Sequence, residues 1–160
     1  MRCLLFILSG LVACFLVGCG ESHSSHGDHD GHAHGAGHVH VAPHGGTLVE
    51  IGEHAFNVEF VRDFEAGKLT AYILDGHAEA YVRLPAPSLD ILVTRSGQPE
   101  TVKLVAVANS QTGEKVGDTS QFEITSEWLK DKGPLSGEIQ TLEIRGSKFA
   151  GVKFQLPGKS

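Results

Sequence analysis

Histidine is the residue type in this chain whose number and spacing indicate chemistry. Ten histidines occur among 160 residues, and eight of them fall between Glu21 and Gly46. These eight are His23, His26, His29, His32, His34, His38, His40 and His44. Imidazole is the commonest metal ligand near neutral pH, and several imidazoles on one short segment raise their effective concentration for the second and third bonds to an ion. The varied spacing predicts many equivalent chelates rather than one fixed site.

The ligand chemistry of the chain beyond Cys19 is free of sulfur. The cysteines are Cys3, Cys14 and Cys19, and Met1 is the only methionine. Histidine nitrogen and carboxylate oxygen favour Zn²⁺, Cu²⁺, Ni²⁺ or Co²⁺, whereas Cu⁺ prefers sulfur. We therefore expect a divalent transition metal as the cofactor or cargo, bound less tightly as the pH falls through about 6.5 because ligand imidazoles must be neutral. The alternative is a solvated, pH-sensitive linker that binds no metal.

Three histidines lie in or beside the predicted folded domain and could form an ordered metal site. His44 precedes two glycines, His54 begins a strand pattern and His77 follows a turn. Three imidazoles, or two with a carboxylate, would suit a divalent ion. The carboxylates that could converge with them are Glu53, Asp75 and Glu79. The alternative is that the three are unrelated surface residues near turns.

Motifs for catalysis are missing from the sequence. It has no nucleophilic cysteine beyond the leader, no G-x-S-x-G elbow, no H-E-x-x-H pair and no glycine-rich phosphate loop. The formal charge is -6, and no lysine or arginine occurs between Arg2 and Arg62, so nucleic acid is a poor partner. We expect a protein that is not an enzyme.

The N-terminus has the features of a lipoprotein signal peptide. Arg2 supplies a positive charge, and residues 4–17 are apolar apart from Ser9 and Gly10. Residues 16–19, Leu-Val-Gly-Cys, resemble the bacterial lipobox, in which the cysteine is acylated. This predicts a membrane anchor on Cys19 and a cell-envelope location facing the periplasm, with Gly20 favouring the outer membrane. An uncleaved anchor is the alternative, although its apolar stretch falls short of the ~20 residues of a spanning helix.

The elements that must position these residues divide the chain into three parts. Residues 1–18 form the predicted signal peptide, and residues 19–43 form a predicted disordered tether, since glycines and scarce apolar residues leave it without a core. Residues 44–160 form one predicted domain, in which apolar and polar residues alternate with period two, as half-buried strands do. The candidate strands are 47–51, 54–63, 68–74, 79–84, 88–95, 100–108, 120–125, 136–145 and 148–156.

Turn residues separate most of these strands and point to an all-β fold. The dipeptides at 66–67, 75–76, 96–97 and 146–147 are predicted hairpin connections, and Pro85 and Pro87 mark a sheet edge or a change of sheet. A helix is predicted only around residues 126–130, with Ser126 as its N-cap. Short strands at regular spacing predict an immunoglobulin-like β-sandwich of about seven to nine antiparallel strands, with a small barrel as the alternative.

Two motifs carry a resemblance to a known family. Pro43-His44-Gly45-Gly46, with residues 48–54, and residues 72–78, Tyr-Ile-Leu-Asp-Gly-His-Ala, resemble a family of bacterial His-rich lipoproteins over about residues 43–84. A similar module occurs near the N-terminus of periplasmic adaptor subunits of heavy-metal efflux systems. The resemblance implies a metal-handling module. The long α-hairpin and lipoyl-like domain of an adaptor are absent from this sequence, so a pump-bridging role is not implied.

These observations lead to two functional hypotheses. The first is an envelope lipoprotein that buffers or delivers divalent transition metals, in association with an efflux system. The second is a structural or protein-interaction module of the envelope, whose His-rich stretch is only a spacer. A metal-dependent envelope hydrolase is a distant third.

Overall fold

The computed structural model describes residues 40–95 and 97–159. The predicted signal peptide, the lipidation site Cys19 and the histidines from His23 to His38 lie outside the described residues. In the part of the chain that is described, no helix combines the length and apolar character needed to cross a membrane.

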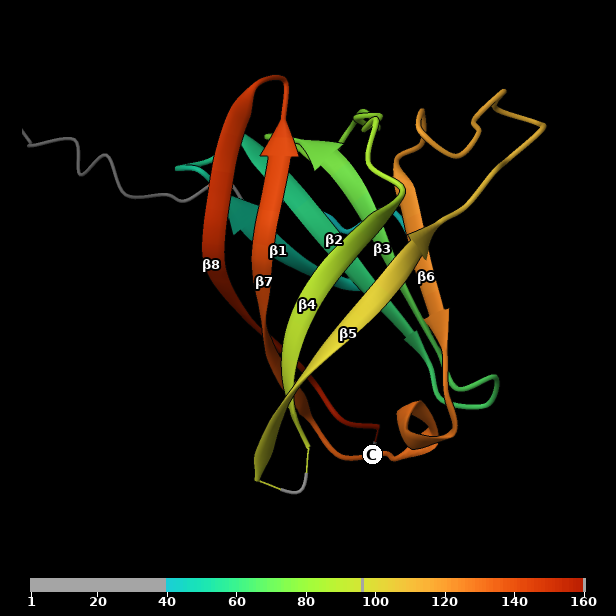
Figure 1. Cartoon of the computed structure of the whole chain (residues 1–160), viewed down its shortest axis with the longest axis vertical. Coiled ribbons are helices and arrows are strands. Elements are labelled where there is room, and N and C mark those ends of the chain that lie inside the picture. The colour runs from blue at the N-terminus through green and yellow to red at the C-terminus, as the bar shows by residue number, and fades with distance from the viewer. Residues whose placement is uncertain (1–39, 96, 160) are drawn as a thin grey trace, which may run out of the picture. The chain divides into compact units, whose positions relative to one another are not determined.

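Eight antiparallel strands form a single sheet (Figure 1). Their order across the sheet is β1-β2-β3-β6-β5-β4-β7-β8. Three runs of consecutive strands, β1–β3, β4–β6 and β7–β8, are therefore joined by two long-range pairings, β3 with β6 and β4 with β7. The strands are β1 (Thr47–Ile51), β2 (Phe56–Asp63), β3 (Lys68–Asp75), β4 (Ser88–Arg95), β5 (Gln98–Ala106), β6 (Gln121–Thr125), β7 (Leu135–Ile144) and β8 (Ser147–Leu156). The all-β class predicted from the alternation is confirmed.

The sheet curls until its two edge strands, β1 and β8, approach each other without pairing. Aromatic side chains fill the interior behind this seam. Phe56 and Phe149 meet edge to face with ring centroids 6.0 Å apart, and Phe60 and Phe154 meet at 4.5 Å. The predicted barrel, which was the alternative, therefore describes this nearly closed sheet more closely than the predicted two-sheet sandwich.

The core lies inside the curled sheet and is formed by alternate residues of every long strand. The largest fully buried side chains are Phe60, Phe122, Ile51, Leu69, Ile73, Leu74, Leu84, Ile91, Leu104, Leu129, Ile139 and Ile144. The alternation of Phe56, Val58 and Phe60 predicted the inward face of β2 correctly. Burial of apolar surface is the main favourable term in folding, so this core holds the sheet in its curled form.

Turn chemistry accounts for most connections. Arg145 and Gly146, with φ of 51° and 81°, make the two-residue turn between β7 and β8, one residue earlier than predicted. The predicted helix is a single 3₁₀ turn, η1 (Glu127–Lys130), which follows Ser126 but receives no side-chain cap from it. The predicted strand at 79–84 makes only isolated bridges at Tyr81 and Leu84, although the side chains of Val82 and Leu84 are buried in the core.

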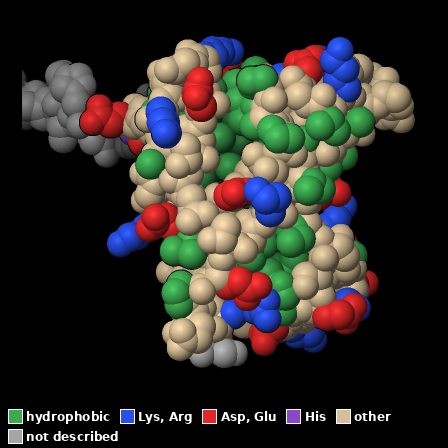
Figure 2. All heavy atoms as spheres, in the orientation of Figure 1, with side chains coloured by type: hydrophobic (Ala, Val, Ile, Leu, Met, Phe, Trp, Pro, Cys, Tyr) green, Lys and Arg blue, Asp and Glu red, His purple; other side chains and the backbone are tan. Residues whose placement is uncertain are grey.

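Pairing between β4 and β7 ends at Ile91 and Ile139, and beyond this point the two strands separate. A hollow of about 460 Å³ opens there, lined partly by Leu84, Leu89 and Leu142. Figure 2 shows hydrophobic side chains in the upper part of this face, with acidic and basic side chains interspersed around them. The sheet is therefore incomplete on this side as well as at the seam.

Candidate functional site

The best-defined polar cluster of the domain forms where the His-rich stretch meets the sheet. Residues 40–46, which we call the lead-in segment, run into β1 and lie against β2. Glu59 of β2 has no exposed side-chain surface, and its Oε2 accepts a 2.7 Å hydrogen bond from Nδ1 of His44. Its Oε1 accepts hydrogen bonds from the backbone N–H groups of His44 (2.8 Å) and Gly46 (2.9 Å). One buried carboxylate thus fixes both the backbone and the ring of His44.

The two glycines after His44 have different roles in this contact. Gly45 has φ of +70°, and its N–H donates to the carbonyl of Ala42, closing a turn. Gly46 has an ordinary φ, but a Cβ there would collide with the backbone oxygen of Phe60. Gly46 therefore allows the lead-in segment to approach β2 closely enough for its N–H to reach Glu59.

Two tyrosines complete the surroundings of His44. The His44 ring stacks on Tyr72 of β3, with centroids 3.8 Å apart and planes 11° from parallel. The Tyr81 hydroxyl lies 3.1 Å from Nε2. With Nδ1–H donating to Glu59, Nε2 is the acceptor and Tyr81 is the donor. Both ring nitrogens of His44 are therefore engaged within the protein.

The tyrosine hydroxyls are held in their protonated form. Burial raises the pKa of Tyr72 above its ordinary value, and the negative charge of Glu123 raises it further. Burial also raises the pKa of Tyr81, with smaller contributions from Glu59 and Glu114. A protonated Tyr81 can act as the donor to Nε2 of His44.

A cavity of about 450 Å³ adjoins this cluster. Its walls combine aromatic rings with amide, hydroxyl, carboxylate and guanidinium groups. The lining residues are His44, Tyr72, Tyr81, Arg83, Asn109, Thr112, Glu114, Ser120 and Gln121. Such a surface can accept a small polar molecule, but its charged groups already have partners within the protein.

Glu114 is the buried charge of this cavity. Its Oε1 accepts hydrogen bonds from Oγ (2.6 Å) and N–H (3.0 Å) of Ser120, and its Oε2 accepts one from Thr112 (3.0 Å). Burial acts to raise the pKa of Glu114, but these hydrogen bonds and the nearby Arg83 outweigh it, so the pKa lies below its usual value. Glu114 is therefore an ionised carboxylate that holds the loop between β5 and β6.

The structure separates the histidines that were predicted to converge. His44 joins Glu59 and the tyrosines, whereas His54 lies in the β1–β2 turn and pairs with Glu50 at 3.0 Å. His77, in the loop after β3, lies beside His40, with ring centroids 5.8 Å apart. Residues 40–95 and 97–159 contain no group of three or more His, Cys, Asp or Glu side chains arranged to hold a metal ion.

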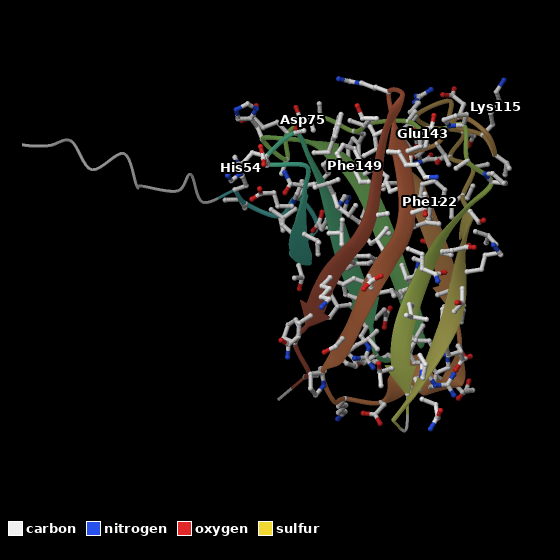
Figure 3. The ribbon with its side chains drawn as sticks, turned by 60° about the vertical axis from the view of Figure 1, so that its left-hand side comes forward. His54, Asp75, Lys115, Phe122, Glu143 and Phe149 are labelled. Atoms are coloured by element: carbon white, nitrogen blue, oxygen red, sulfur yellow. The ribbon has the colours of Figure 1, made fainter. Side chains whose placement is uncertain are left out.

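The carboxylates that were predicted to converge with these histidines, Glu53, Asp75 and Glu79, also do not form one site. Glu53 has φ of 52° and lies in the β1–β2 turn. Asp75 ends β3, and its Oδ1 accepts hydrogen bonds from the N–H groups of Glu79 and Ala80. Figure 3 shows His54 and Asp75 on one side of the upper end of the sheet and Lys115 on the opposite side of that end. Among the histidines of residues 40–95 and 97–159, the rings of His40 and His77 are the two that lie next to each other.

The central residues of the cluster were not identified from the sequence. Alternation placed Asn57 and Glu59 on the polar, outward face of β2, but both are buried, because the lead-in segment and the ends of β3 cover that face. Tyr81 and Glu114 carried no motif, and Tyr72 was part of a motif quoted only for its family resemblance. The one available signal was the His-Gly-Gly sequence of residues 44–46, since a charged residue facing two glycines can bind their backbone N–H groups.

The fold and the site define an all-β domain with a histidine fixed at the start of its sheet. Comparisons with known protein families, with curated proteins and with solved structures find no match to this chain.

Proposed function

We propose that this protein is a cell-envelope lipoprotein that binds, buffers or delivers divalent transition metals through its His-rich segment. The observation that carries the proposal is the run of eight histidines from His23 to His44, immediately before a folded domain. Zn²⁺, Cu²⁺, Ni²⁺ and Co²⁺ are the ions that imidazole and carboxylate ligands favour in the absence of sulfur. Acylation of Cys19 would hold the segment at the membrane, facing the periplasm.

The contacts around Glu59 support a separation of two roles, in which the His-rich segment binds metal and the folded domain holds the end of that segment. His44 is fixed by two hydrogen bonds to Glu59 and by its stack on Tyr72. A metal ion would have to displace Tyr81 from Nε2 in order to use His44 as a ligand. We therefore assign the main binding capacity to the histidines from His23 to His40, and we assign His44 the role of holding the segment at a constant point on the domain.

A metal titration of the mature chain, purified without an affinity tag, tests the proposal. The informative variant replaces six histidines with asparagine and so keeps the length and polarity of the segment. The positions are His23, His26, His29, His32, His34 and His38. With Zn²⁺ or Ni²⁺ at pH 7.5, calorimetry should show several equivalents bound by the parent chain and most of this uptake lost in the variant. Equal uptake by the two proteins, or none by the parent, would overturn the proposal.

The anchor needs a separate test. Metabolic labelling with a fatty acid should mark the full-length chain and leave Cys19→Ser unlabelled. Incorporation of label into the serine variant would contradict acylation at this position.

A structural or protein-interaction module of the envelope is the second candidate. The observation in its favour is that both ring nitrogens of His44 are used inside the protein, as expected where a spacer joins a domain. Under this hypothesis the six asparagine substitutions would leave capture of an envelope partner unchanged, and the parent chain would bind no metal. Association with a metal efflux system is a proposal that rests on the resemblance of residues 43–84 alone.

A further inference from the structure

His40 and His77 come from segments far apart in the sequence and meet on the surface of the domain. His40 lies in the lead-in segment, four residues before His44, and His77 lies in the loop that follows β3. Their ring centroids are 5.8 Å apart, and their planes are nearly perpendicular, at 88°. His77 is exposed and His40 is half-buried, so a solute ion can reach the pair.

This distance suits two ligands of one ion. A metal–nitrogen bond of about 2.1 Å places the metal about 3 Å from each ring centroid, so two imidazoles on one ion have centroids about 5–6 Å apart. The observed separation lies within that interval. Binding would require the two side chains to rotate so that one nitrogen of each ring points at a common ion.

The loop that carries His77 is held in place by its own hydrogen bonds. Asp75 accepts from the N–H groups of Glu79 and Ala80, and the Asn57 side chain donates to the carbonyls of Asp75 (3.1 Å) and Gly76 (3.0 Å). A Cβ at Gly76 would collide with the backbone oxygen of His54, so the loop also packs closely on the β1–β2 turn. His77 therefore projects from a rigid support.

The segment that carries His40 is fixed a few residues further on, because Glu59 binds the N–H groups of His44 and Gly46. Ligands that are ordered before binding lose less conformational entropy when an ion arrives. Asp75 adds a negative charge close to His77, which favours a cation at this place.

We propose that His40 and His77 form a two-imidazole metal seat on the folded domain, which takes a divalent transition metal and joins the lead-in segment to the loop after β3. This inference rests on the proposed function, since the ion is the cargo that the His-rich segment gathers. With two protein ligands, the remaining coordination positions stay open to water or to a receiving ligand. An ion held in this way can be passed on.

The test uses Cu²⁺ at pH 7.5 and the variant with asparagine at the six positions from His23 to His38. Into this background are placed His77→Asn or, as the matched control, His54→Asn. Both replace an exposed histidine in a loop, and Gly76, next to His77, lies against the backbone of His54. His54, however, pairs with Glu50 and not with His40. Calorimetry gives the affinity, and pulsed electron paramagnetic resonance counts the imidazoles bound to copper.

The background should keep one equivalent of Cu²⁺. His77→Asn should weaken its binding at least about tenfold, because the second ligand of a chelate acts at high effective concentration, and should lower the imidazole count by one. His54→Asn should change neither quantity. His40→Asn is a second variant with the same expected loss, and circular dichroism checks that each protein is folded. If His77→Asn and His54→Asn bound Cu²⁺ with equal affinity, the proposed two-imidazole seat would be wrong.

The parent chain separates this inference from the proposed function. If the parent takes up several equivalents while His77→Asn has no effect in the background, the seat is wrong and the His-rich segment still binds metal. A second outcome is that the six-asparagine background binds one Cu²⁺ through His77 and takes up as much metal in total as the parent chain. The two-imidazole seat is then correct, and the proposed role of the His-rich segment is wrong. Absence of uptake by every protein overturns both.

Discussion

Glu59 and His44 form a buried contact, in which a carboxylate with no exposed surface accepts a 2.7 Å hydrogen bond from an imidazole 15 residues earlier in the chain. A second carboxylate–histidine pair, Glu50 and His54, has a similar distance of 3.0 Å, but these side chains are 45% and 71% exposed. The described residues thus offer two carboxylate–histidine pairs that differ chiefly in burial.

Removal of the buried carboxylate should destabilise the domain strongly. Glu59→Ala leaves the N–H groups of His44 and Gly46 without their acceptor, and we expect a loss of about 3 kcal/mol in the free energy of unfolding. Glu59→Gln keeps one acceptor oxygen and should lose about 1–2 kcal/mol. Glu50→Ala is the matched control and should lose less than about 1 kcal/mol, because exposed pairs contribute little. Urea unfolding at pH 7 measures all three, and similar losses for Glu59→Ala and Glu50→Ala would contradict the role assigned to Glu59.

Adjacent glycines should respond differently to alanine. Gly45→Ala places a side chain in open space and meets only the strain of a positive φ, so we expect a loss of about 1 kcal/mol. Gly46→Ala forces a Cβ against the backbone of Phe60 and moves the N–H away from Glu59, so we expect a loss of about 3 kcal/mol. Thermal unfolding of the two variants decides the order. A larger loss for Gly45→Ala would show that the lead-in segment does not lie against β2.

Acid should weaken the domain partly through Glu114. Its pKa is lower in the folded protein than in the unfolded chain, so its contribution to stability is present above the unfolded value of about 4.5 and is lost as the pH falls through the folded value. We expect Glu114→Gln to have a shallower decline of urea midpoint between pH 6 and pH 3 than the parent. Ser120→Ala removes the 2.6 Å donor and should lose about 1.5–3 kcal/mol at pH 7 and less at pH 3. Parallel pH profiles for parent and variants would exclude this role of Glu114.

The tyrosines give a direct spectroscopic probe of the site, because Tyr72 and Tyr81 are the only two in the chain. Burial raises the pKa of both tyrosines above the ordinary value of 10. Tyrosinate absorbance of the native protein should therefore have its midpoint above pH 10, and in urea the midpoint should fall to about pH 10. The raised pKa values contribute stability that is full below pH 10 and is lost as the pH rises through the folded values. If tyrosinate absorbance of the native protein had its midpoint at or below pH 10, the two phenol groups would be exposed to water and the assigned burial would be wrong.

The alternation of apolar and polar residues, together with the turn residues, was sufficient to predict the all-β class and most of the strands. Alternation at Phe56, Val58 and Phe60 identified the inward face of β2, and the turn chemistry at Gly67 and Gly146 located two hairpins. These features depend on neighbours in the sequence, so a single sequence contains them. Alternation could not distinguish one curled sheet from two packed sheets, because both bury every second residue.

The sequence by itself determined an all-β domain preceded by a concentrated run of imidazoles, since composition and strand period are local properties. Only the tertiary structure decided that β3 pairs with β6 and β4 with β7, that Glu59 is buried, and that His40 meets His77 while His54 stands apart. The physical reason is that alternation predicts the side of a strand on which a residue lies, whereas burial of that side depends on which distant segment covers it.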